Sequence, residues 1–275
     1  MAAKTDPLVH MGTITAGEAR EIYKANPVIL LPMGSQEDQG PHAPMGDYLL
    51  AEKIAELAAI CASNAGTRTL VAPVLPFGGA DWFGSMVGGI AISQATLTTV
   101  IAEMVDSLHR NGLTRIIVIN GHGGNVGPIA EVARELYQRE QIVLPSLYLW
   151  RIASALLPGI LGGADKAAVA DGHGADPLTS IGLHLFPELI RKDLIPAAKP
   201  LKKDPVLDLQ FTNLGLASFE GHEVAMPNDC DETFNLGVAK GDPRLCSAET
   251  GAALTETLTD ICARFIVHFA GKVAA

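Results

Sequence analysis

Short apolar runs alternate with longer segments of helical periodicity along the first half of the chain. Runs of apolar and β-branched residues are typical of buried strands, and apolar residues that recur every three or four positions are typical of helices. Ser93 is a favourable helix cap, and Pro145 interrupts the last strand. The pattern predicts strands at residues 27–32, 69–74, 115–120 and 142–150, and helices at residues 47–62, 93–109 and 127–138.

The later part of the chain is less regular. It contains a predicted helix at 180–189, a surface excursion rich in Lys, Asp and Pro at 197–208, and a closing helix at 247–271. No internal repeat or low-complexity linker interrupts the sequence. Strands that alternate with helix-length crossovers indicate a parallel sheet covered on both faces. We therefore expect a single α/β domain over residues 1–275 with an irregular C-terminal third.

Composition narrows the class of protein. With 48% hydrophobic residues, the chain can bury a sizeable core, and its net charge of −10 argues against a nucleic-acid partner. No apolar stretch has the length of a membrane span, and the N-terminus lacks the apolar core of a signal peptide. The cysteines show no CxxC spacing, which favours reduced, structural thiols. We expect a cytoplasmic enzyme or binding protein without membrane contact.

Three polar, glycine-containing clusters stand out against this apolar background. Residues 34–47 follow the first strand, residues 121–125 follow the third strand, and residues 171–180 precede a helix. In parallel sheets, ligands gather at the carboxyl ends of the strands. The first two clusters satisfy that rule directly, so we expect them to lie close together.

The first two clusters offer metal ligands. In NGHGGN, His122 sits at the tip of a strand-to-helix turn, and Glu37 and Asp47 add carboxylates from the other loop. Two carboxylates and an imidazole suit Zn²⁺, Mn²⁺ or Fe²⁺. The structural alternatives are a glycine-rich turn with a surface histidine, and carboxylates that cap a turn or, for Asp47, the following helix.

The third cluster, ADGHGADPLTS, brings His173 and Asp176 among glycines. A histidine at the mouth of a metal site can act as a general acid toward a leaving amine. The glycine-rich loop before the helix at 93–109 contains Trp82, which can either form a wall of the substrate pocket or pack in the core.

Taken in order, LLPMGSQEDQGPHAPMGD, NGHGGN, DGHGADPLTS and GVAKGDPRLCSAETG resemble the motifs of the creatininase (creatinine amidohydrolase) family. The resemblance covers most of the chain. It implies a three-layer αβα sandwich with a mostly parallel central sheet, a homo-oligomer that is often a hexamer, and a small-molecule substrate. Members hydrolyse cyclic amides, formamides or small peptide C–N bonds with a divalent metal ion.

The resemblance also implies roles for individual residues. Glu37, Asp47 and His122 match family metal ligands, Asp176 falls where the third motif has a metal-binding Glu, and His173 lies near the reacting bond. This chain departs from the family in four ways. Gln39 stands where a metal-binding His is usual, and Gly124 stands where some members carry Glu. The spacing from Glu37 to Asp47 is one residue shorter than usual, and Asp81 and Trp82 stand in a loop that often contains a His.

These departures lead to a hypothesis about metal number. A neutral amide is a poorer ligand for Zn²⁺ than imidazole, so we expect one tightly held ion, with a second ion weak or absent. The alternative is that Asp176 and Gln39 keep a second, harder ion such as Mn²⁺. We assign His173 to proton delivery, and Gln39, Trp82, Gly123, Gly124 and Asn125 to substrate binding, with the backbone amides of the last three as oxyanion donors.

Two further readings compete with the hydrolase. The altered ligand set could mark a non-catalytic relative that binds a small molecule or serves as an assembly subunit, although retention of Glu37, Asp47 and His122 together argues against it. A nucleotide-dependent α/β enzyme is disfavoured, because the chain has no GxxxxGK[ST] and no GxGxxG that opens a helix in a βαβ unit. The function that we expect is therefore metal-assisted hydrolysis of a cyclic amide, ureide or formamide.

Overall fold

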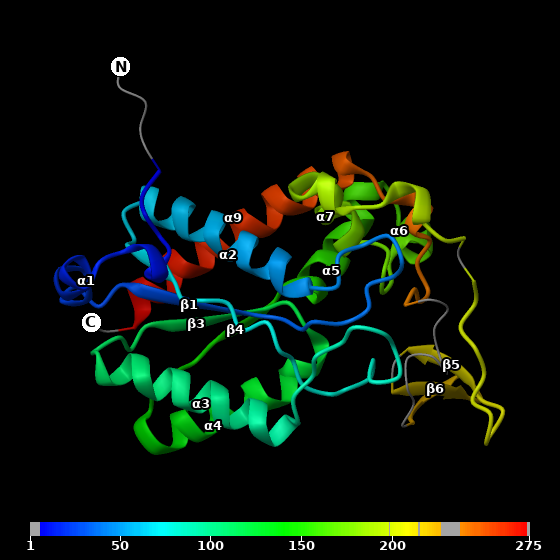
Figure 1. Cartoon of the computed structure of the whole chain (residues 1–275), viewed down its shortest axis with the longest axis horizontal. Coiled ribbons are helices and arrows are strands. Elements are labelled where there is room, and N and C mark those ends of the chain that lie inside the picture. Colours follow the sequence, from blue (N-terminus) through cyan, green and yellow to red (C-terminus); the bar gives the residue numbers. More distant parts are fainter. Residues whose placement is uncertain (1–5, 198, 214, 227–236, 274–275) are drawn as a thin grey trace.

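The computed structural model describes residues 6–197, 199–213, 215–226 and 237–273. At its centre lies a four-stranded parallel sheet with the strand order β2-β1-β3-β4 (Figure 1). Met33, the last residue of β1, is in register with Asn120, the last residue of β3. The two central strands therefore deliver the chain to the same edge of the sheet. The strands are β1 (Val28–Met33), β2 (Thr69–Val71), β3 (Ile116–Asn120) and β4 (Ser146–Tyr148).

Helices cover both faces of this sheet (Figure 1). One layer contains α2 (Asp47–Asn64), α5 (Leu149–Leu161), α7 (Leu178–Leu185) and α9 (Ala248–Lys272), and the other contains α3 (Gln94–Arg110) and α4 (Val126–Glu140). Strand side chains alternate between the layers. Leu30 packs in the first core, and Ile29 and Leu31 pack in the second. The predicted αβα sandwich with a parallel sheet is confirmed.

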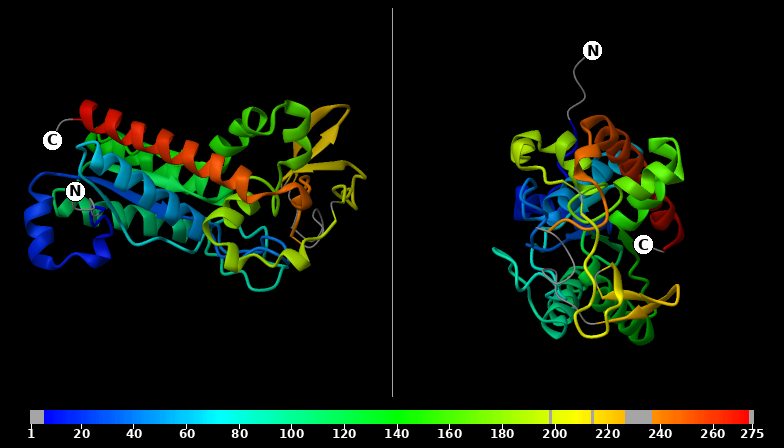
Figure 2. Two further views of the ribbon diagram at one scale, coloured as in Figure 1. Left: turned by 90° about the horizontal axis from the view of Figure 1, so that it is seen from above. Right: turned by 90° about the vertical axis from the view of Figure 1, so that its right-hand side faces the viewer.

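A second, antiparallel sheet lies at the end of the molecule where the central strands terminate (Figures 1 and 2). Its strand order is β5-β6-β7. The sequence pattern did not predict this sheet, because its strands are only four residues long. Its strands are β5 (Gln210–Asn213), β6 (Leu216–Phe219) and β7 (His222–Ala225). The remaining elements are α1 (Ala16–Tyr23), α6 (Ala164–Ala170), and the 3₁₀ turns η1 (Met11–Thr13), η2 (Gly123–Asn125), η3 (Pro187–Leu189), η4 (Lys192–Leu194) and η5 (Pro243–Leu245).

Several predicted boundaries were wrong. The strand predicted at 142–150 is reduced to β4, because Leu149 already begins α5. The strand predicted at 69–74 ends at Val71, shortly before Pro73, which has no N–H to donate to a ladder. The helix predicted at 180–189 begins at Leu178 and ends at Leu185, since the residue before Pro187 is disfavoured in a helix. The predicted cap of α3 by Ser93 is confirmed.

Two expectations from composition concern membranes and cysteines. Among the helices of the described residues, none combines the length and apolar character that crossing a membrane requires. Cys61, Cys246 and Cys262 are free thiols. Cys230 lies outside the described residues.

Candidate metal centre

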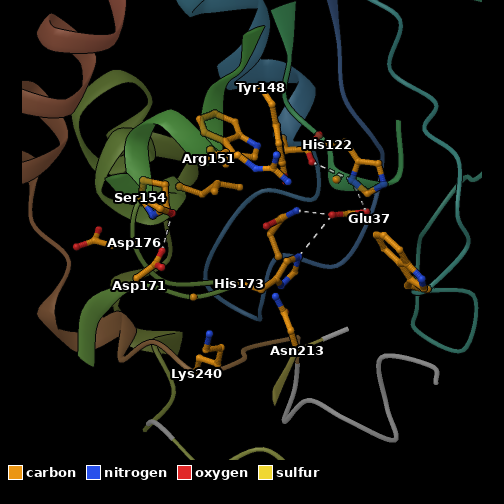
Figure 3. Close-up of a pocket in the computed structure, with 18 of the residues that line it drawn as sticks. Glu37, His122, Tyr148, Arg151, Ser154, Asp171, His173, Asp176, Asn213 and Lys240 are labelled. Atoms are coloured by element: carbon orange, nitrogen blue, oxygen red, sulfur yellow. Dashed lines mark hydrogen bonds and ion pairs between the residues drawn. The ribbon is translucent and has the colours of Figure 1, made fainter. Parts of the chain in front are cut away.

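Three side chains converge at the edge of the sheet, and Figure 3 labels two of them, Glu37 and His122. Glu37 comes from the segment between β1 and α2, Asp47 is the first residue of α2, and His122 follows β3. Each offers one ligand atom, and these atoms all lie within 4.8 Å of one another. His122 Nδ1 is 3.1 Å from Glu37 Oε2 and 3.3 Å from Asp47 Oδ2. All three residues are at most 5% exposed. We call Glu37, Asp47 and His122 the triad.

The loop geometry depends on a close backbone approach at Gly34. A Cβ atom there would overlap Asp47 Oδ1 and would lie 2.6 Å from the Tyr48 backbone nitrogen. A glycine directly after β1 therefore lets the chain fold back so that the start of α2 reaches the sheet edge. The cap of α2 is Gly46, and the Asp47 side chain makes no cap hydrogen bond. The alternative that Asp47 serves as a helix cap is wrong.

In each triad residue, one polar side-chain atom is hydrogen-bonded to a neighbouring group. The other polar atom faces the centre of the triad. The Ser35 amide donates to Asp47 Oδ1 at 2.6 Å, so Oδ2 faces His122. Gln39 Nε2 donates to Glu37 Oε1 at 2.9 Å, so Oε2 faces His122. His122 Nε2 lies 3.1 Å from the carbonyl oxygen of Gly79 and donates to it. That bond leaves Nδ1 as the nitrogen that faces the two carboxylates and could bind a metal ion.

This arrangement fits a divalent cation. In a neutral His122, the Nδ1 lone pair would face two carboxylate oxygens with nothing positive between them, so the site requires a cation, whether a proton or a metal ion. Ligands about 2.0–2.1 Å from Zn²⁺ in tetrahedral geometry are roughly 3.3 Å from one another. The observed separations of 3.1 and 3.3 Å match that value. Two oxygens and one nitrogen suit Zn²⁺, Mn²⁺ or Fe²⁺.

The pKa shifts of the three triad residues also favour a bound cation. Burial, reinforced by the charge of Glu37, raises the pKa of Asp47 to about 6. Burial also opposes ionisation of Glu37, but the charge and hydrogen bond of His122 outweigh it and lower the pKa of Glu37 to about 2. Burial opposes a charged His122 as well, yet the two carboxylates hold its pKa well above the ordinary value. The triad therefore attracts positive charge at Nδ1.

His173 lies beside the triad and on the cavity wall (Figure 3). Its Nδ1 donates to the carbonyl oxygen of Gly237 at 2.8 Å, and its Nε2 lies 3.5 Å from Glu37 Oε1. The ring of Phe83 stacks on it, with ring centres 4.8 Å apart. These contacts fix the imidazole so that Nε2 faces the triad.

The NGHGGN turn divides into a cavity wall and a support behind it. Gly123 lines the cavity. Asn125 lies behind His122: its side chain donates to the Gly34 carbonyl at 3.1 Å and accepts from the Gly79 amide at 3.1 Å. Gly124 is also buried there, and a Cβ at this position would overlap the Gly79 carbonyl oxygen. Asn125 thus links the segments that follow β1, β2 and β3.

Asp176 is not part of the triad group. It is fully buried, and Figure 3 shows its carboxylate pointing toward the segment that leads into α9. Burial raises the pKa of Asp176, although the nearby Ser180 and Cys246 act in the opposite direction. The structure therefore places Asp176 beside the start of α9 and at a distance from the cluster that the sequence predicted it to join.

A cavity of about 510 Å³ opens in front of the triad. Trp82 and Gln39 line it, and Trp82 also packs against Phe83, so both interpretations of this tryptophan apply. The side-chain oxygen of Gln39 has no hydrogen-bond partner among the described residues. Several polar residues that line the cavity were not predicted from the sequence. They are Tyr148, Arg151, Ser154, Asp171, Asn213 and Lys240. The rule that ligands bind at strand ends, applied to β4, would have found Tyr148 and Arg151.

The chain is similar to known proteins in sequence and in fold. Residues 12–266 match the family model "Creatininase: Creatinine amidohydrolase". The chain is 27% identical to the mycofactocin precursor peptide peptidase of Mycobacterium ulcerans, over 95% of this chain and 92% of the relative. A putative creatinine amidohydrolase from Bacteroides fragilis superposes with a TM-score of 0.78 at 23% identity, covering 98% and 100% of the two chains. The solved structure "Creatininase Mn" gives a TM-score of 0.76 at 23% identity, covering 96% and 99%.

Proposed function

The chain belongs to the creatininase family, and from this premise we propose that it hydrolyses an amide C–N bond of a small molecule with a single tightly bound divalent ion. The family resemblance predicted from the ordered motifs is thereby confirmed, and the chain is a metal-dependent amidohydrolase. The substrate class that we favour remains a cyclic amide, a ureide or a formamide. The peptidase relative makes a peptide bond the second candidate.

One observation carries the proposal. Two carboxylates and an imidazole, all buried, present free atoms to one another at the wall of a cavity large enough for a small molecule. A purely structural role does not explain why the three residues lie together. In each of them, one polar side-chain atom already makes a hydrogen bond outside the triad, and the other faces the triad. This favours an enzyme over a non-catalytic assembly subunit.

The proposal of a single tight ion rests on two of the departures from the family pattern. Gln39 directs its amide nitrogen, which cannot bind a metal ion, to Glu37. Gly124 has no side chain that could bind a metal ion. The Cβ atom of any larger residue at this position would lie 2.6 Å from His122 Nε2 and would overlap the Gly79 carbonyl oxygen. Asp176 lies outside the triad group. The metal is Zn²⁺, Mn²⁺ or Fe²⁺, and the relative "Creatininase Mn" supports including Mn²⁺.

Amide hydrolysis requires a nucleophile, stabilisation of an oxyanion and a proton for the leaving nitrogen. When bound, a divalent ion would supply a water whose pKa is lowered to about 7 and would polarise the substrate carbonyl. His173 Nδ1 donates to the Gly237 carbonyl, so Nε2, which faces the triad at its open side, can accept the proton that the attacking water releases and pass it to the leaving nitrogen. The Gly123 backbone lines the cavity and offers an N–H to the developing oxyanion. Trp82 and Phe83 wall the site.

A hydrolase screen tests the proposal. The purified protein is stripped with chelator, reloaded separately with Zn²⁺, Mn²⁺ and Fe²⁺, and assayed on lactams, cyclic ureides, N-formyl amines and dipeptides. We expect hydrolysis of at least one class that disappears with chelator and returns with metal. Metal-independent turnover would contradict the role of the metal, and tight small-molecule binding without turnover in any metal form would favour the non-catalytic alternative.

We further propose that the protein acts in the cytoplasm as a homo-oligomer, with a hexamer as the assembly expected from the family resemblance. Sedimentation velocity of the metal-loaded protein tests the assembly state. A monomer at micromolar concentration would contradict it.

A further inference from the structure

Two cationic side chains line the same cavity as the triad. Figure 3 shows Arg151 beside Tyr148 in the upper part of the view and Lys240 in its lower part, with Asp171 and His173 between them. Arg151 belongs to the first turn of α5, directly after β4, and Lys240 lies on the segment that leads into η5. Their positions at the carboxyl end of the sheet are those of substrate-contacting residues in parallel α/β folds.

Neither cation has an ion-pair partner in the part of the chain that the structure describes. Among the described residues, no carboxylate oxygen lies within 4.0 Å of the charged nitrogens of Arg151 or Lys240, whereas Arg139, Arg244 and Arg264 each have such a partner. The guanidinium of Arg151 lies over the ring of Tyr148, 5.8 Å from its centre. A guanidinium on an aromatic face keeps its hydrogen-bonding edge available to a ligand.

Two acids outside the triad, Asp171 and Asp176, are the candidates to neutralise the two cations. Asp171 accepts a hydrogen bond of 2.8 Å from the Ser154 hydroxyl. Asp176 is fully buried and points toward the segment before α9. Both acids line the same cavity as the two cations, but in the described part of the chain neither forms an ion pair with Arg151 or Lys240. The uncapped N-terminus of α5, which lies at the same wall, adds to the positive potential.

The backbone ties both cations to the catalytic wall. The Ala239 amide, adjacent to Lys240, donates to the His173 carbonyl at 2.9 Å. Arg151 follows Trp150, whose indole N–H donates to the carbonyl of Gly121, next to His122. The two side chains are therefore held relative to the site and not carried on an independent loop.

We propose that Arg151 binds a carboxylate of the substrate while the substrate's amide bond lies at the triad, and that the charge of Lys240 in the same cavity adds a longer-range attraction. The substrate class is then an amide that bears a free carboxylate, such as an N-formyl amino acid, a ureido acid or a lactam acid. A carboxylate matches the planar fork of a guanidinium, and Arg151 has no ion-pair partner among the described residues that would compete for it. This inference rests on the proposed function, since it names the substrate of that same site.

Matched substrate pairs test the inference by kinetics. Each pair is an N-formyl amino acid or dipeptide and its C-terminal carboxamide, assayed with the metal-loaded protein. We expect kcat/KM for the acid to exceed that for the carboxamide by about tenfold or more, the size of a charge-assisted hydrogen bond. Arg151→Gln should reduce this ratio toward one, and Lys240→Asn should reduce it partly. Asn suits position 240 because the backbone there has φ 64°.

Arg110→Gln is the matched control, because Arg110 is exposed at the end of α3 and does not line the cavity. It should keep the wild-type ratio. An equal kcat/KM for acid and carboxamide, or an acid preference that survives in both Arg151→Gln and Lys240→Asn, would overturn the inference while leaving the hydrolase proposal intact.

A binding measurement decides the inference even if no substrate is hydrolysed. The only two tryptophans of the chain, Trp82 and Trp150, both line the cavity, so intrinsic fluorescence reports on it directly. The metal-loaded protein is titrated with propionate, with the uncharged propionamide, and with inorganic phosphate. We expect propionate to bind more tightly than propionamide, and Arg151→Gln to weaken propionate by about tenfold. Unchanged propionate affinity in Arg151→Gln, or tighter Arg151-dependent binding of phosphate, would refute the carboxylate assignment.

Discussion

His122 Nδ1 lies 3.1 Å from Glu37 Oε2, although the two residues follow different strands of the sheet. The contact exists because β1 and β3 are neighbours that end in register. The second nitrogen of His122 and the second oxygen of Glu37 are each held by another group. The remaining pair of atoms is therefore set at the separation of two ligands on one cation.

Metal binding and proton delivery should separate by mutation. We expect His122→Ala to lose both the metal ion and turnover, because it removes the sole nitrogen ligand of the triad. His173→Ala should keep the metal ion, and its kcat should fall by a factor of about 10²–10⁴, the usual contribution of a general acid. Metal content and kcat measured on the same preparations check this. Near-normal turnover in both variants would show that the roles are misassigned.

Gly124 should be intolerant of a side chain. A Cβ there would overlap the Gly79 carbonyl and would lie 2.6 Å from His122 Nε2. We expect Gly124→Ala to cost about 1–3 kcal/mol of unfolding free energy, typical of overpacking, and to weaken metal affinity. Gly127→Ala is the control, because its Cβ would meet Gln94 at an ordinary 3.7 Å. Urea unfolding and metal titration compare the two, and equal effects would argue against the steric account.

Asn125 should stabilise the site without touching substrate. Asn125→Ala leaves the Gly34 carbonyl and the Gly79 amide without their side-chain partner. Each buried group left unsatisfied costs about 1–3 kcal/mol, so we expect a clearly lower melting temperature and weaker metal affinity. Asn64→Ala, at the exposed end of α2, serves as the control. A wild-type melting temperature in Asn125→Ala would contradict the supporting role.

Metal affinity should rise with pH in two regimes. The pKa of His122 is held well above its ordinary value, so metal binding near pH 7 must displace its proton. The pKa of Asp47 is raised to about 6, so below that pH a second proton must leave as well. The pKa of Glu37, lowered to about 2, adds no proton in this range.

We therefore expect the metal dissociation constant to change about tenfold per pH unit near pH 7 and more steeply below pH 6. Competition titrations from pH 5 to pH 8 measure this slope. Calorimetry in buffers of different ionisation enthalpy counts the released protons independently. An affinity that is flat across the range would mean that His122 and Asp47 are not ligands.

The sequence predicted the triad well, because strand periodicity locates the ends of β1 and β3 and the polar residues follow at once. It failed at Tyr148 and Arg151, because no glycine or proline marks the change from β4 to α5, and the apolar residues 149–150 suit either structure. Lys240 could not be placed from sequence, since its position depends on a hydrogen bond between Ala239 and His173. The position of Asp176 depends likewise on packing against the segment before α9.

The most direct test of the central claim is the metal content per chain after purification and reloading, measured by elemental analysis. We predict one tightly held ion in the wild-type protein and its loss in Glu37→Gln, Asp47→Asn and His122→Asn. Circular dichroism checks that each variant is folded. Two tight ions per chain would contradict the single-ion account. No tight ion, or an ion retained in all three variants, would contradict the metal centre itself.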